Sequence, residues 1–171
     1  MSAPRFSVAL LDLDADRSDF ECGVEPLDRY FKTQVSQDIK RRVTACFTAL
    51  DAQGHIAGYY TLASASILLT DLAEHLARKM PRYPNVPAVR MGRLAVDRNF
   101  KGQGLGAAML ADALRRATTA EIVAYALVVD AKDLAAAEFY AHHGFAATSG
   151  NPLLLFLPLG TVKGLIKWPA P

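Results

Sequence analysis

The alternation of apolar and polar positions predicts strands that alternate with helices. Short apolar runs predict strands at residues 6–11, 43–50, 56–63, 89–96, 122–129 and 153–158. Apolar residues three and four positions apart predict helices from Pro26 to Lys40–Arg42, over 71–80, after Gly106 and over 134–142. Asp51–Gly54 forms a hairpin turn between two strands. We therefore expect an α/β fold with a mixed central sheet of about six or seven strands flanked by helices.

The central stretch of the chain combines a strand, a glycine-rich loop and a helix. The strand ends in Leu94–Val96, and the helix has apolar residues in a 3.6-residue repeat at Leu110, Ala113, Leu114 and Ala117. Between them, backbone N–H groups around Gly102, Gly104 and Gly106 can point into an open concavity. A helix N-terminus favours phosphate, and Lys101 and Arg98 add positive charge. This stretch predicts a pyrophosphate site, the alternative being a glycine-rich connection with solvated charges.

Length and composition are typical of one globular domain over residues 1–171. Of these residues 51% are hydrophobic, which excludes a disordered chain. No apolar run has the length of a membrane span and no signal core is evident, so we expect a cytoplasmic protein without membrane association. The two cysteines, Cys22 and Cys46, match no zinc spacing, and no metal is expected.

Charge is distributed unevenly along the chain. Residues 10–30 are mostly acidic in their charged positions, whereas residues 78–116 have nine basic residues against two acids. A basic middle segment is a plausible footprint for an anionic ligand, although any one of these cations can belong to a solvated face.

Three known phosphate-binding loops compete for the glycine-rich stretch. A P-loop needs Gly-Lys-Ser/Thr at its end, but here Lys101 precedes the glycines and Ala107–Ala108 follows them. A dinucleotide-binding loop fits G-x-G-x-x-G/A, with Asp130 after the next strand as a ribose ligand. In that fold, however, the loop follows the strand almost directly, whereas the polar residues 97–101 intervene here.

The third pattern resembles the GCN5-related N-acetyltransferase (GNAT) superfamily. Its acetyl-CoA loop, [Q/R]-x-x-G-x-[G/A], is similar to Lys101–Gly106 with Lys at the first position, and its F-Y-x-x-x-G-F segment is similar to Phe139–Phe145. The resemblance implies that acetyl-CoA is the acetyl donor and that backbone groups of Leu94, Ala95 and Val96 pair with its pantetheine arm. It also implies a pyrophosphate site made by Lys101, Gly102, Gln103, Gly104, Leu105, Gly106 and Ala107.

A narrower resemblance extends over nearly the whole chain. Segments similar to the toxin acetyltransferases of bacterial type II toxin–antitoxin systems are residues 20–23, 27–31, 92–97, 126–131 and 155–158. This resemblance implies acetylation of the α-amino group of aminoacyl-tRNA, which blocks translation. It also implies neutralisation by an antitoxin with a ribbon–helix–helix DNA-binding domain, and a toxin homodimer.

Acetyl transfer needs an acid for the departing thiolate. Tyr140 is the candidate, because a phenol is protonated at neutral pH, the alternative being an aromatic that packs its helix onto the sheet. A strand amide near Val96 can polarise the thioester carbonyl. His142 and His143 are expected to interact with the helix end, since no carboxylate or cysteine partner is evident nearby.

No residue stands out as a general base, and this bears on the acceptor. An α-amino group titrates near ~8 and is partly neutral at physiological pH, whereas a lysine amine titrates near ~10.4. An α-amine therefore suits the site better than a lysine side chain. An RNA acceptor also requires cations, for which the candidates are Arg78, Lys79, Arg82, Arg90 and Arg93, followed by Arg41 and Arg42.

Two other functions fit the same sequence. One is a GNAT enzyme that acetylates a small-molecule amine or a protein N-terminus, although cationic small amines would favour an acidic cleft. The other is a non-catalytic module that binds acyl-CoA or nucleic acid, which would leave Tyr140 without a role.

Overall fold

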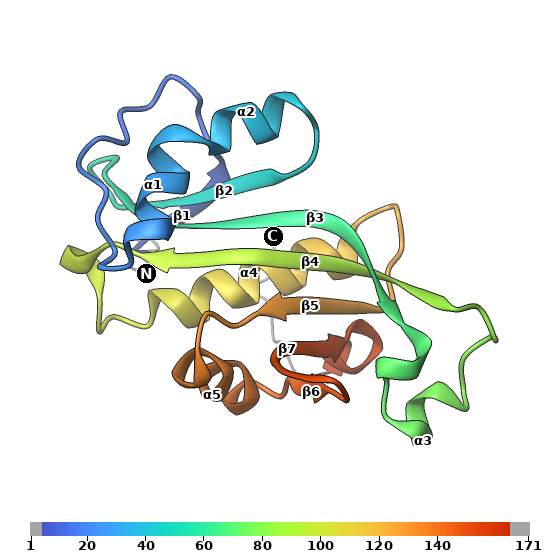
Figure 1. The fold of residues 1–171 in the computed structure, drawn as a ribbon. Helices are drawn as coiled ribbons and strands as arrows, with labels where there is room; N and C mark the ends of the chain where they lie inside the picture. The colour runs from blue at the N-terminus through green and yellow to red at the C-terminus, as the bar shows by residue number, and fades with distance from the viewer. Residues whose placement is uncertain (1–4, 165–171) are drawn as a thin grey trace. The chain divides into compact units, whose positions relative to one another are not determined.

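The strands of the computed structural model, which describes residues 5–164, form a mixed sheet in the order β1-β2-β3-β4-β5-β7-β6 (Figure 1). β4 and β5 pair in parallel, whereas β1–β2, β2–β3, β5–β7 and β6–β7 are antiparallel pairs, so the expected mixed α/β sheet is confirmed. The strands are β1 Ser7–Leu10, β2 Ala45–Leu50, β3 Ile56–Leu68, β4 Asn85–Val96, β5 Ala126–Asp130, β6 Ala146–Thr148 and β7 Asn151–Pro158. The helices are α1 Glu25–Thr33, α2 Val35–Lys40, α3 Glu74–Ala77, α4 Leu105–Thr119 and α5 Leu134–His142, with 3₁₀ turns η1 Leu69–Asp71, η2 Arg98–Phe100 and η3 Leu159–Gly164.

Backbone contacts divide the chain into two compact units. Unit 1 contains the chain up to Ala63 together with Gly92–Ala113, and unit 2 contains Ser64–Met91 together with the chain from Leu114 onward. The prediction of one domain over residues 1–171 stays a prediction. None of the helices within residues 5–164 is long and apolar enough to cross a membrane.

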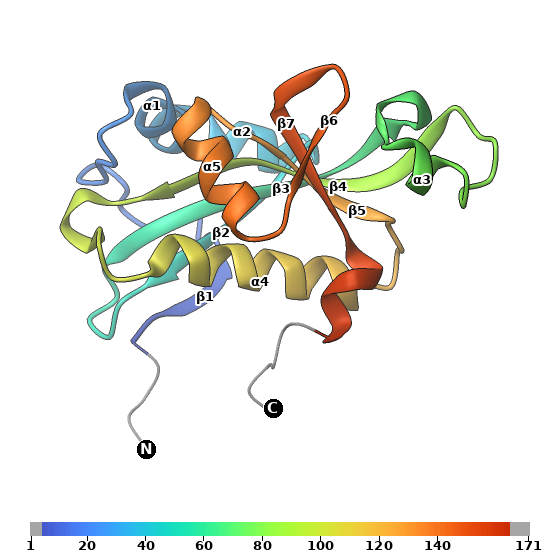
Figure 2. The same cartoon turned by 90° about the horizontal axis from the view of Figure 1, so that it is seen from below.

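In unit 1, α1 and α2 cover one face of the strands, and the first half of α4 covers the other (Figure 2). Both faces of β3 have a large side chain for a helix to cover, because the adjacent residues Tyr59 and Tyr60 point to opposite faces of the sheet. The Tyr59 ring stacks on Phe31 of α1 with a centroid separation of 4.3 Å, whereas the Tyr60 hydroxyl donates to Asp112 on α4. Both tyrosines are fully buried.

Gly58 allows β3, β4 and α4 to approach one another closely. A Cβ at this position would lie 2.8 Å from the backbone oxygen of Ala95 and 2.7 Å from Cε of Met109. A side chain here would therefore push against the part of β4 that leads into the glycine loop.

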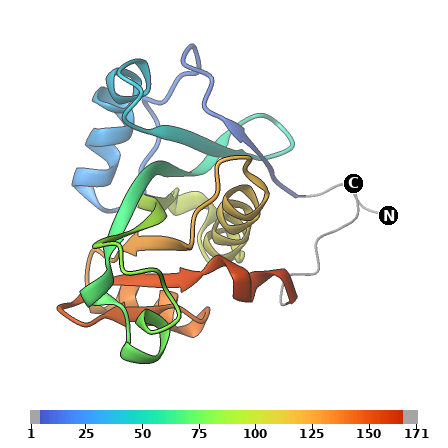
Figure 3. The ribbon, with the colours of Figure 1, turned by 90° about the vertical axis from the view of Figure 1, so that its right-hand side faces the viewer.

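Unit 2 has its own apolar core. Ile67, Leu72, Val86, Val128 and Phe156 belong to one buried cluster that joins the end of β3, the residue after η1, β4, β5 and β7. Figure 3 shows the segment from β3 to α3, in green, beside the red β7.

Several element boundaries differ from the sequence-based expectation. The helix expected from Pro26 to Lys40–Arg42 is two helices that are broken at Gln34, whose φ is −122°. The Thr33 hydroxyl donates to the Arg29 carbonyl at 2.7 Å, a bond that competes with helix continuation. The strand expected over 122–129 begins only at Ala126, because Ile122 and Val123 are exposed rather than paired in the sheet.

Other boundaries shift by a few residues. The helix expected over 71–80 shortens to α3 after a 3₁₀ turn, and the strands expected at 56–63 and 89–96 extend to Leu68 and back to Asn85. The strand expected at 43–50 begins at Ala45, and the last strand begins at Asn151 and pairs with β6, which the sequence reading missed. The helix expected over 134–142 is confirmed as α5, with Gly144 at φ +95° after it. The sequence also predicts a short tail over residues 162–168, of which residues 165–168 lie outside the described residues.

Candidate active site

The glycine loop of unit 1 joins the end of β4 to α4. Gly102 and Gly104 both have φ of +77°, a conformation that favours glycine, and a Cβ added at either would meet nothing within 4 Å. The amide of Ala108 donates to the Gly104 carbonyl at 3.1 Å as α4 begins. The amides of Leu105, Gly106 and Ala107 precede this bond, so they have no acceptor within the helix. Open space beside a helix N-terminus fits a pyrophosphate.

The end of β4 presents backbone groups next to this loop. β4 pairs in parallel with β5 from Ala88 to Met91. Leu94–Val96 follow this paired part of the strand, so their backbone groups on that edge lie outside the β5 register. On the other edge, the Asp97 amide donates to the Ala57 carbonyl at 2.8 Å. A strand held on one edge in this way can pair its other edge with an extended, amide-containing arm, and pantetheine has these groups.

The loop is connected to the segment that precedes α1. The Asp97 carboxylate is buried and accepts from the amides of Glu21 at 3.0 Å and Asn99 at 2.9 Å. The ammonium of Lys101 donates to the Cys22 carbonyl at 2.6 Å. Lys101 therefore has a protein partner, in addition to the phosphate role expected from the sequence.

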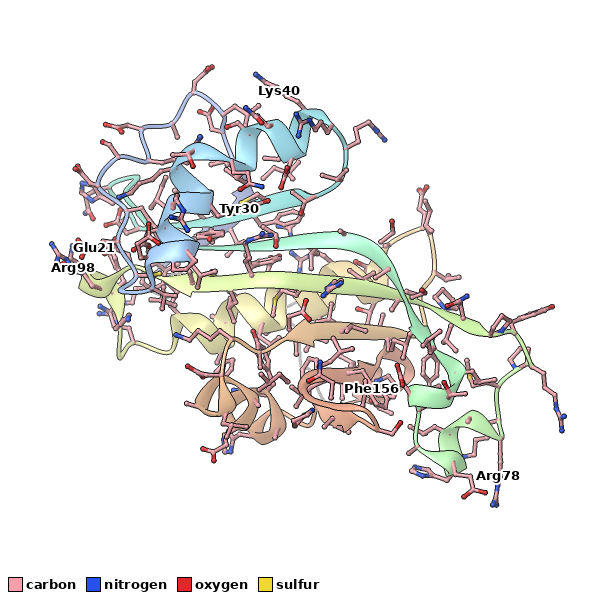
Figure 4. All side chains as sticks on the ribbon, viewed as in Figure 1. Glu21, Tyr30, Lys40, Arg78, Arg98 and Phe156 are labelled. Atoms are coloured by element: carbon pink, nitrogen blue, oxygen red, sulfur yellow. The ribbon has the colours of Figure 1, made fainter. Side chains whose placement is uncertain are left out.

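Arg98, expected to add positive charge beside the loop, pairs with an acid. Its guanidinium lies 3.1 Å from a carboxylate oxygen of Glu21, and Figure 4 shows the two labelled side chains together. The backbone amide of Arg98 also donates to the Glu21 carbonyl at 2.8 Å. The ion pair reduces the positive charge that Arg98 brings to the loop.

Glu21 and Asp97 had no functional role in the sequence analysis. Two of the family-like segments, residues 20–23 and 92–97, contain them, and the structure shows that these segments are hydrogen-bonded to each other. That both segments resemble the same toxin family was the one feature of the sequence that pointed to Glu21 and Asp97. Their contact could not be read from the sequence because 76 positions separate the two residues.

Tyr140 lies on α5 in unit 2. Asp133 caps the start of this helix by accepting from the Ala136 amide at 2.8 Å. The ring of Tyr140 is buried between Phe139 and Phe145, with centroid separations of 5.2 and 5.7 Å. Burial, and secondarily the charge of Asp130, raises the pKa of Tyr140 above its ordinary value. The phenol is therefore protonated throughout the physiological range, as a general acid requires.

The histidines that follow Tyr140 pack at the end of α5. The rings of His142 and His143 lie 5.3 Å apart, and that of His143 lies 4.8 Å from Phe139. Both histidines are exposed, and each contacts a neighbouring ring at the end of the helix.

The five candidate RNA-binding cations differ in their surroundings. Arg78 (Figure 4) lies 2.6 Å from Glu74, and Arg90 pairs with Asp130, both within unit 2. Arg93, in unit 1, stacks on the Tyr30 ring. Lys79 and Arg82 are exposed, and neither has an ion pair within residues 5–164. These two are the most available to an anionic ligand.

A family model described as an acetyltransferase (GNAT) domain matches residues 21–153. A relative from Mycobacterium tuberculosis (strain ATCC 25618 / H37Rv), named tRNA-acetylating toxin, is 34% identical over 167 residues, which cover 96% of each chain. The chain is therefore an acetyltransferase. It belongs to the GNAT family, and the expectation of an acetyl-CoA-dependent N-acetyltransferase is confirmed.

Solved structures extend this similarity. AtaT complexed with acetyl-methionyl-tRNAfMet is 28% identical with a TM-score of 0.87, and the match covers 94% of this chain and 98% of AtaT. A tyrosine-to-phenylalanine mutant of AtaT, bound to acetyl-CoA and the C-terminus of the antitoxin AtaR, is 27% identical with a TM-score of 0.78. That match covers 94% of this chain and 97% of the other. The expected resemblance to type II toxin acetyltransferases is thereby confirmed.

Proposed function

We propose that this protein is a toxin that transfers an acetyl group from acetyl-CoA to the α-amino group of aminoacyl-tRNA and so blocks translation. The observation that carries the proposal is the match over nearly the full length to AtaT in complex with acetyl-methionyl-tRNA. The relative named tRNA-acetylating toxin supports the same substrate class.

The donor site is assigned to unit 1. Backbone groups of Leu94, Ala95 and Val96 hold the pantetheine arm, and the amides of residues 101–107 hold the pyrophosphate. When bound, acetyl-CoA supplies an activated acetyl thioester. A backbone amide near Val96 polarises the carbonyl of this thioester by hydrogen bonding.

Tyr140 is assigned the role of general acid. Its hydroxyl holds a proton that can be given to the departing thiolate sulfur, and the raised pKa keeps that proton in place at neutral pH. Related toxin structures carry a tyrosine-to-phenylalanine substitution, the same change that would test Tyr140 here.

The acceptor is assigned as an α-amino group, because this amine can react without a strong general base. An α-amino group with a pKa near ~8 is partly neutral at physiological pH, so the amine can attack without a dedicated carboxylate or histidine. Lys79 and Arg82, with Arg78, Arg90 and Arg93, are assigned to the tRNA phosphates.

The partners follow from the same relatives. AtaT binds the antitoxin AtaR, and we assign a cognate antitoxin of the ribbon–helix–helix type to this chain. A homodimer in the cytoplasm, with residues 1–171 acting as one catalytic domain, completes the proposal.

The proposal is tested by thiol release from acetyl-CoA in the presence of different acceptors. Release that requires aminoacylated tRNA and fails with deacylated tRNA would support it. Release with polyamines or peptide N-termini, and none with charged tRNA, would favour a GNAT enzyme for small amines or protein N-termini instead.

A further inference from the structure

Three hydrogen bonds join the glycine loop to residues 21 and 22, which are far away in sequence but inside the same unit, and a fourth continues from Cys22 to α1. Asp97 accepts from the Glu21 amide, the Arg98 amide donates to the Glu21 carbonyl, and Lys101 donates to the Cys22 carbonyl. The fourth bond continues inward, because the Cys22 amide donates to the Asp28 carboxylate at 2.8 Å. Asp28 is a buried residue on α1, so the connection extends from the loop to that helix.

Among these four bonds the Lys101 ammonium is the one side-chain donor, whereas the Arg98 guanidinium joins the same segments through an exposed ion pair with Glu21. The bond from the Lys101 ammonium to the Cys22 carbonyl is 2.6 Å long, and the ammonium lies 3.7 Å from where a Cβ on Gly23 would be. Gly23 has φ of +89°, so the backbone turns sharply where the ammonium approaches. A charged donor to a carbonyl is stronger than a neutral one, which suits a link between two loops.

We propose that Lys101 is a positioning residue that fastens the segment 21–23, and through Asp28 the start of α1, to the pyrophosphate loop. This inference rests on the proposed function of that loop. Lys101 fixes the conformation of the loop before acetyl-CoA binds. Asp97, at the other end of the loop, holds the same segment through the Glu21 amide.

The chemistry of lysine explains why this residue can fill the role. The GNAT pattern has Gln or Arg at this position, and Arg binds a phosphate with two parallel hydrogen bonds. A lysine ammonium is a compact donor on a flexible stem, and it can bend back to a nearby carbonyl. With one proton committed to the Cys22 carbonyl, Lys101 holds the loop to segment 21–23, and the loop amides remain available to the phosphates.

The test compares Lys101→Met with Arg98→Met by hydrogen exchange in the free protein. Both changes remove one cation from the same loop, but Arg98 contributes an exposed ion pair, which stabilises little. We expect amides of residues 20–28 to exchange at least about tenfold faster in Lys101→Met and near the wild-type rate in Arg98→Met. Lys101→Arg should restore much of the protection, since its guanidinium can also donate to the carbonyl.

A second measurement separates positioning from direct phosphate contact. Acetyl-CoA affinity of Lys101→Met should fall roughly three- to tenfold, while its dependence on salt concentration stays as in the wild type. If the amides of residues 20–28 exchange in Lys101→Met at the wild-type rate, the proposal is overturned. This holds if acetyl-CoA affinity falls with a smaller salt dependence, which indicates direct phosphate contact, and also if the affinity does not fall. If the wild-type protein binds no acetyl-CoA, the proposed function fails, whereas the exchange result still decides the role of Lys101.

Discussion

The guanidinium of Arg93 lies 3.4 Å from the centroid of the Tyr30 ring, which joins β4 to α1 within unit 1. The Tyr30 hydroxyl in turn donates to Asp38 of α2 at 2.8 Å. A cation in this position is attracted by the face of the ring, and it packs its planar group against it. Arg93 therefore supports the strand that leads into Leu94–Val96, in addition to the tRNA contact proposed for it.

This contact predicts a stability effect. Arg93→Ala should lower the free energy of unfolding by about 1 kcal/mol, because the stacking on Tyr30 is lost. Urea unfolding measures it. Lys79→Ala, which removes an exposed cation, is the control and should change stability by no more than about 0.5 kcal/mol. Equal stability of the two variants would show that Arg93 has no structural role.

Gly58 should tolerate no side chain. In Gly58→Ala the new methyl group meets the backbone oxygen of Ala95, so β4 or the Met109 side chain has to move, at a cost of about 2 kcal/mol. Thermal unfolding measures the loss, and acetyl-CoA affinity reports the displacement of Ala95. Gly150→Ala is the matched control, since a Cβ there meets nothing within 4 Å. A Gly58→Ala protein as stable as this control would contradict the close packing.

Much of the fold could be predicted because its elements are periodic. The apolar face of α4 at Leu110, Ala113, Leu114 and Ala117 is buried as its spacing indicates, and α5 has the expected bounds. The prediction that the strand begins at Ile122 was wrong, because β-branched residues favour a strand only where a neighbouring strand pairs with them.

The site was predictable in part for a similar reason. The glycine loop is local in sequence, so its positive φ angles at Gly102 and Gly104 could be expected. The partner of Lys101 could not, because the Cys22 carbonyl is 79 positions away. The stacking of Arg93 on Tyr30 depends in the same way on tertiary packing, and charge alone suggested only RNA binding.

Replacing Tyr140 by phenylalanine should separate binding from turnover. The ring stays in its aromatic surroundings, so acetyl-CoA should bind as in the wild type, whereas the loss of the proton donor should lower kcat about a hundredfold or more. Tyr125→Phe, which changes another tyrosine of unit 2 outside the proposed machinery, is the control. Near-normal turnover of Tyr140→Phe would remove Tyr140 from the mechanism.

The pH profile should reflect the raised pKa of Tyr140. Because burial disfavours the phenolate, the phenol stays protonated as the pH rises past its ordinary pKa of ~10. Activity should therefore rise with pH as the acceptor amine loses its proton near ~8, with no decline attributable to Tyr140 below pH ~10. A descending limb that appears below that pH in the wild type and is absent from Tyr140→Phe would contradict the assignment.

Reversing charge at Arg78, Lys79 and Arg82 should weaken tRNA acetylation without affecting the donor site. Phosphate contacts depend on these cations, so affinity for charged tRNA should fall at least about tenfold and become less sensitive to salt. Binding of acetyl-CoA should be unchanged. Lys132→Glu changes an exposed lysine outside the candidate set and serves as the control. Unchanged acetylation of charged tRNA by the triple variant would contradict the assignment of these three cations to the tRNA phosphates.

The most direct test of the proposed function is mass spectrometry of aminoacyl-tRNA after incubation with acetyl-CoA and this protein. We predict aminoacyl-adenosine heavier by one acetyl group on the α-amino nitrogen, formed at least about a hundredfold more slowly by Tyr140→Phe. Charged tRNA that stays unmodified, while the same protein consumes acetyl-CoA with another amine, would contradict the central claim.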